Sequence, residues 1–65
     1  MEYTLKQWRG IMQVSQAELA AAINRTQITI SHWETGKSIP RYDDMLKMRA
    51  ALGLGPGDVI LLPMD

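Results

Sequence analysis

Apolar residues along the chain recur at helical spacing in several short stretches, and turn-forming residues separate these stretches. The stretches lie too close together to leave room for strands joined by crossover connections. We therefore expect an all-α fold, a compact bundle of four to five short helices that forms a single domain over residues 1–65.

The starts of the first two helices are marked by capping residues. The hydroxyl of Thr4 can cap the first helix while the side chain of Gln7 reaches back to the backbone, and Ser15 and Glu18 can do the same for the second. Asn24 suits a left-handed turn residue after the second helix. The residues expected to form the core stripe of the first helix are Leu5, Trp8 and either Ile11 or Met12.

The third helix is expected to begin at the capping residue Thr26 and to run to about Thr35, with Gly36 as a left-handed stop. The two sides of this helix differ in chemistry. Ile30 and Trp33 fall on the apolar side, and the other side carries Gln27, Ile28, Ser31 and His32.

The fourth helix is expected to follow Pro40 and to end at Gly53, with Asp43 and Asp44 at its positively polarised start. Residues 55–65 can then form a short last helix or a strand. The residues that we expect the fourth helix to turn toward the core are Tyr42, Met45, Leu46, Met48 and Leu52.

The charge balance argues mildly against a nucleic-acid partner, because seven basic and seven acidic residues give a net charge of zero. The distribution along the chain changes this picture. Residues 1–41 carry five basic and three acidic side chains, a net +2, whereas residues 42–65 carry two basic and four acidic, a net −2. The basic part can still meet phosphate.

Several functional classes lack the residues that they need. The chain has one histidine, no cysteine and no acid–base constellation for catalysis, so we expect no enzyme activity. It has neither a phosphate-cradling glycine loop nor a metal-ligand cluster, and we expect no metal, cofactor or small-molecule ligand. Without a membrane span or a signal peptide, a soluble cytoplasmic protein is expected.

A short capped helix, a tight turn and a second helix with a polar outer face make the unit that places a helix in the DNA major groove, here over about residues 15–34. The sequence resembles the lambda-repressor and Cro-like helix-turn-helix family over nearly its whole length. The segments that carry the resemblance are Ser15-Gln-Ala-Glu-Leu-Ala20, Thr26-Gln-Ile-Thr-Ile-Ser31, Trp33-Glu-Thr-Gly-Lys37 and Pro40.

The resemblance implies a five-helix bundle that binds a double-stranded DNA operator, commonly as a homodimer on a (pseudo)palindromic site. It also implies a regulator that represses transcription or antagonises a repressor, in a bacterial cell and associated with the nucleoid. The origin of such a regulator would be a phage, a plasmid or a bacterial operon.

The resemblance also implies which residues read bases: Gln27, Ile28 and His32, with Thr29 and Ser31 nearby. Gln27 can bond an adenine edge through two hydrogen bonds, Ile28 can cover a thymine methyl, and His32 can donate to a guanine acceptor. Each good contact contributes ~1 to 3 kcal/mol of discrimination. The alternative for Gln27 and Ile28 is a solvated helix start.

By the same resemblance, Gln16 and Thr26 stand at phosphate-anchoring helix starts, although both residues can act as caps alone. Arg9 and Glu34 match a family pair that forms an internal salt bridge, which is a structural role. The further residues that we expect beside the DNA backbone are Gly36, Lys37, Ser38 and Arg41.

Three residues depart from the family pattern. Arg25 stands where the family usually has a buried valine, and we expect its stem to cover the core while its charge contacts phosphate or water. Gln13 replaces a frequent glycine and costs some turn strain. Arg49 replaces a frequent alanine, and we expect it to pair with an acidic group, within the chain or across an interface.

Four consecutive apolar residues near the end of the chain cannot all face one small core from a helix: Val59, Ile60, Leu61 and Leu62. An exposed apolar cluster favours a partner, and a symmetric dimer is the first choice, with simple core closure as the alternative. Net zero charge and this cluster also leave open a protein-interaction module of the same fold, such as an antirepressor or an antitoxin-type protein bound to a second regulator.

Overall fold

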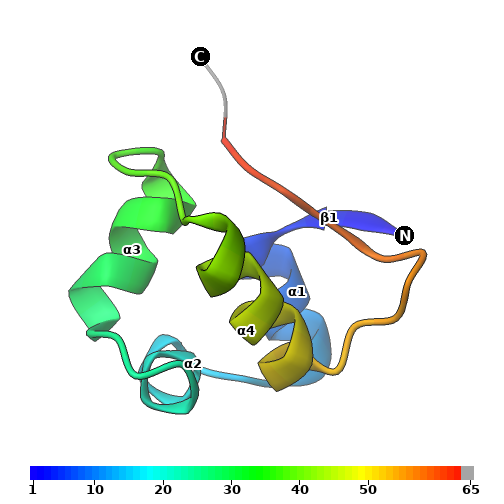
Figure 1. Ribbon diagram of the computed structural model, residues 1–65, viewed down its shortest axis with the longest axis horizontal. Coiled ribbons are helices and arrows are strands. Elements are labelled where there is room, and N and C mark those ends of the chain that lie inside the picture. The colour runs from blue at the N-terminus through cyan, green and yellow to red at the C-terminus, as the bar shows by residue number, and fades with distance from the viewer. Residues whose placement is uncertain (64–65) are drawn as a thin grey trace.

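The computed structural model describes residues 1–63, and within them the fold is mostly helical, as predicted (Figure 1). The helices are α1 Leu5–Met12, α2 Gln16–Ala22, α3 Gln27–Thr35 and α4 Tyr42–Leu52. Two short strands, β1 Glu2–Thr4 and β2 Val59–Leu61, lie on the side of the molecule away from α2 and α3.

The two strands form a parallel pair in which Tyr3 is opposite Ile60. The sequence left a strand open for residues 55–65 but did not predict one at residues 2–4, and the helical bundle forms the crossover that joins the two parallel strands. The side chain of Trp8 closes the junction, since its Nε1 donates to the Val59 carbonyl at 2.8 Å.

Residues 59–61 are therefore a strand and not the fifth helix that the family resemblance implied. Positions 64 and 65 of the 55–65 segment lie outside the described residues. Alternation along β2 buries Ile60 and leaves Val59 and Leu61 44% and 40% exposed, while Leu62 is half-buried.

The predicted helix ends are confirmed. Both capping boxes are present, with the hydroxyls of Thr4 and Ser15 accepting from the third residue of each helix. Thr26 caps α3, and Gly36 ends it in a left-handed conformation at φ 84°. Asn24 is also left-handed, at φ 59°.

The core contains residues from every helix and from β2: Leu5, Trp8, Leu19, Ala20, Ile23, Ile30, Trp33, Met48, Leu52 and Ile60. The prediction that either Ile11 or Met12 completes the core stripe of the first helix was wrong, because Ile11 is 50% and Met12 38% exposed. The helix ends at Met12, so its last turn projects beyond the core.

The predicted core face of α4 was also wrong in part. Asp44, Met48 and Leu52 are buried at a spacing of four residues and define the inward face. At about 100° per residue, Tyr42 and Leu46 lie roughly 120° and 160° from the centre of that face. They are 79% and 50% exposed.

Within residues 1–63, Arg49 forms no ion pair with an acidic side chain, although its charge contributes to the lowered pKa of Asp58. Its guanidinium donates to the backbone carbonyls of Gly55, at 2.6 Å, and of Asp58. These bonds hold the loop between α4 and β2 against the helix. Gln13 adopts the left-handed conformation at φ 58° that a glycine would adopt at lower cost.

Candidate nucleic-acid interface

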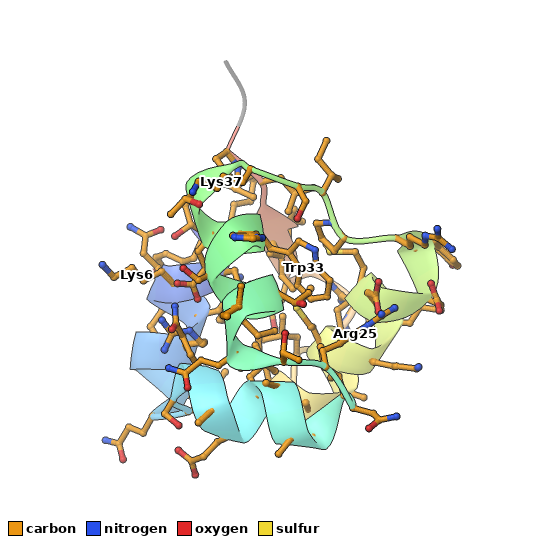
Figure 2. All side chains as sticks on the ribbon, turned by 90° about the vertical axis from the view of Figure 1, so that its left-hand side faces the viewer. Lys6, Arg25, Trp33 and Lys37 are labelled. Carbon is orange, nitrogen blue, oxygen red and sulfur yellow. The ribbon has the colours of Figure 1, made fainter. Side chains whose placement is uncertain are left out.

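Helix α3 is seated firmly against the rest of the molecule. Ile30 and Trp33 on its inner side are 0% and 4% exposed, and α2 packs directly beside it. A backbone bond from the Arg25 N–H to the Ala20 carbonyl, at 2.8 Å, fixes the turn between the two helices. The outer side of α3 faces the viewer in Figure 2, so its side chains are presented from a rigid base.

The residues expected to read bases do not have equal access to solvent. Gln27 is exposed, and Ile28 is 67% exposed although it is a large apolar side chain. Ser31 and His32 are half-buried on the same outer side. Thr29 lies at the margin of this side, and its hydroxyl is 2.9 Å from that of Thr26.

A line of side-chain bonds connects the start of α3 to its end by way of α2. Glu34 accepts from Arg9 Nη2 at 3.1 Å and from Gln16 Nε2 at 3.0 Å. Gln16 in turn accepts from Gln27 Nε2 at 3.4 Å. The ion pair is well shielded, with side-chain exposures of 14% for Arg9 and 6% for Glu34.

The residues expected beside phosphate surround α3. The loop after α3 is held by its own backbone, since the N–H groups of Lys37 and Ser38 both donate to the His32 carbonyl, at 2.9 and 3.4 Å. Figure 2 shows Lys37 at this end of the helix. Arg41, at the start of α4, is exposed.

The partner of the Arg25 side chain differs from the phosphate or water that the sequence suggested. Its guanidinium reaches across to α4, as Figure 2 shows, and its Nε and Nη2 donate to the two oxygens of Asp44 at 3.1 and 3.3 Å. Asp44 is 2% exposed and also accepts from the Arg41 backbone N–H. Arg25 is thus engaged in an internal ion pair that neither sequence interpretation included, and its side chain remains 42% exposed.

Sequence reasoning passed over two residues near this surface. Lys6 of α1 extends into solvent at one margin of the view in Figure 2 and adds a cation to the side that carries α3. Thr35 is exposed at the end of α3, and its hydroxyl donates to the Ser31 carbonyl at 3.0 Å. Helical periodicity signals Thr35, whereas the placement of Lys6 depends on how α1 packs.

The start of α2 carries a carboxylate beside Gln16. The pKa of Glu18 is lowered from its ordinary value of 4.5, first by the bond from the Ser15 backbone N–H and then by the bond with the Ser15 hydroxyl. Its negative charge stabilises the helix start but repels phosphate locally.

The described residues 1–63 contain no surface pocket and no cluster of metal-binding side chains. None of the helices in this part of the chain is long and apolar enough to cross a membrane.

Comparison with known proteins gives one match. The family model described as helix-turn-helix matches residues 5–59, and no curated protein and no solved structure matched the chain. The matched segment includes all four helices of the described residues and most of the surface built around α3. The chain belongs to the lambda-repressor/Cro-like helix-turn-helix family of DNA-binding transcription regulators.

Proposed function

We propose that the protein is a sequence-specific, double-stranded DNA-binding regulator, a repressor or Cro-like switch component of a phage, plasmid or bacterial operon. The observation that carries the proposal is the exposure of Ile28, at 67%, beside Gln27 on a helix whose other side is fixed in the core. A large apolar side chain kept in water at the start of a rigid helix suits contact with a thymine methyl group.

In this proposal α3 enters the major groove with its N-terminal residues at the base edges. Gln27 pairs with adenine, and His32 donates to a guanine acceptor. Thr29 and Ser31 shape the contact from either side.

The DNA backbone contacts act independently of sequence and fix the position of α3 in the groove. The groups proposed to contact phosphate are those at the start of α2 and α3 and in the following loop: Gln16, Thr26, Gly36, Lys37, Ser38 and Arg41. Arg25, whose side chain remains 42% exposed, is proposed to contact phosphate while it keeps its hydrogen bonds with Asp44.

We further propose that two copies bind a (pseudo)palindromic operator, because each copy presents one short reading helix. Val59 and Leu61, which point outward from β2 at 44% and 40% exposure, are the proposed contact between copies. Leu62 continues this apolar edge.

The test is selection from a random duplex library, followed by binding measurements with a Gln27→Ala/Ile28→Ala variant. The matched control is Ile11→Ala/Gln13→Ala, which removes the same two residue types at exposed positions outside α3. We expect a (pseudo)palindromic site, which the α3 variant no longer prefers although it retains weak binding. Equal behaviour of the two variants would contradict recognition through α3.

A second candidate is an interaction module that keeps the fold and binds another regulator. It is favoured by the net charge of zero and by the exposed apolar side chains of Ile39 and Tyr42, at 71% and 79%. This candidate predicts no enriched duplex and no DNA affinity that depends on salt.

A further inference from the structure

Two hydrogen bonds link Glu34 to Gln27 through Gln16, and the chemistry of the groups fixes which atom donates in each. Glu34 as a carboxylate can only accept hydrogen bonds, so the amide atom of Gln16 that lies 3.0 Å from it must be the donor Nε2. The oxygen of Gln16 is then turned toward Gln27. Only an N–H can donate to that oxygen, so Gln27 directs its Nε2 toward Gln16, at 3.4 Å.

The amide of a glutamine can usually turn its oxygen or its nitrogen toward a neighbour, because the two ends are nearly equal in size. In this chain the orientation is set from the buried end. The Glu34 side chain is 6% exposed, so water competes little for its carboxylate, whose second oxygen accepts from Arg9 Nε. Gln16, which bonds both Glu34 and Gln27, is half-buried, whereas Gln27 is exposed.

We propose that Glu34 is a positioning residue for base recognition, which fixes the amide orientation of Gln16 and through it that of Gln27. This inference rests on the proposed function, in which Gln27 reads a base. With one N–H directed to Gln16, Gln27 keeps its oxygen and its second N–H for the base edge. An acceptor and a donor in a fixed order match the N6 amino group and N7 of adenine.

The experiment uses the duplex that the full-length protein selects, in four versions that differ at the base pair whose preference Gln27→Ala abolishes. The wild type is expected to prefer adenine there by roughly 5- to 150-fold. Glu34→Gln retains the size of the side chain but can present either a donor or an acceptor to Gln16. We expect it to reduce the adenine preference by about threefold or more. All affinities are measured well below the melting temperature of each variant.

Arg9→Met is the matched control, because it breaks the same ion pair but leaves a carboxylate facing Gln16. It is expected to lower stability while the adenine preference stays as in the wild type. A purely structural role for Glu34 instead predicts that Glu34→Gln and Arg9→Met behave alike, with stability reduced and the preference intact.

Gln16→Met provides a second variant that leaves the ion pair untouched. It should reduce the adenine preference as Glu34→Gln does, and combining the two changes should reduce it no further. The proposal is overturned if both variants keep the preference that Gln27→Ala abolishes, or if Arg9→Met relaxes it as much as Glu34→Gln. If Gln27→Ala itself leaves every preference unchanged, base reading by Gln27 fails and the proposed function fails with it.

Discussion

Replacing Arg25 by methionine is expected to lower the free energy of unfolding by about 2 to 3 kcal/mol, a magnitude that follows from its ion pair with Asp44. Methionine keeps an apolar stem over the core but removes two of the three hydrogen bonds that Asp44 accepts. Breaking a fully buried ion pair costs about 3 to 5 kcal/mol, whereas an exposed pair contributes about 0 to 1 kcal/mol.

This pair lies between those limits. Asp44 is 2% exposed, but the Arg25 side chain is 42% exposed, so solvent screens one half of the interaction. For a domain of this size, the expected loss corresponds to a fall of roughly 8 to 24 °C in the melting temperature.

The assay is urea unfolding of Arg25→Met, Asp44→Asn and the double variant, with Arg41→Met as the matched control. Arg41 meets Asp44 only through its backbone N–H, so removing its side chain should change stability by less than about 0.5 kcal/mol. We expect a coupling energy of about 1 to 2 kcal/mol between Arg25 and Asp44. A coupling energy near zero, with Arg25→Met as stable as the control, would refute the reasoning.

Three further predictions concern stability. Glu34→Ala should lower it by about 3 kcal/mol, because Arg9 is left shielded and unpaired, and an unchanged thermal melt would contradict this. Gln13→Gly should raise it by up to about 1 kcal/mol in urea unfolding, because it relieves the left-handed conformation at φ 58°, and a loss would contradict that account. The pKa of Glu18 is lowered by the Ser15 backbone N–H, and that of Asp58 by the Gly55 N–H. Their stabilisation is present above the ordinary values of 4.5 and 3.8 and is lost as pH falls through the lowered folded-state pKa values. Urea unfolding from about pH 6 to about pH 2 should show this loss, and Glu18→Gln should reduce it.

Features that depend on residues close together in the sequence could be predicted from it. Ser15 and Glu18 are three residues apart, and the Gly36 stop follows directly from the end of α3, so the helix ends could be placed without a structure. The exposure of Gln27 and Ile28 follows from helical periodicity once Ile30 and Trp33 are buried.

Features that depend on distant residues could not be found in this way. The strand pair joins Tyr3 to Ile60 across the whole chain, and the burial of Asp44 requires Arg25 from another helix. α4 offers apolar residues on two sides, and only the packing decides that Tyr42 stays outside.

The same limit applies to the candidate interface. Gln16 and Gln27 were assigned separately to phosphate and base, and their contact emerges only when α2 and α3 are placed together.

The most direct test of the central claim is how the affinity for the selected duplex depends on salt, measured by fluorescence anisotropy. Release of counterions from four phosphates predicts a slope of about −3.6 in log affinity against log salt. Lys37→Ala should make that slope less steep by about 1 without changing base preference. A slope near zero for the wild type would contradict DNA recognition by α3 and would favour a protein partner.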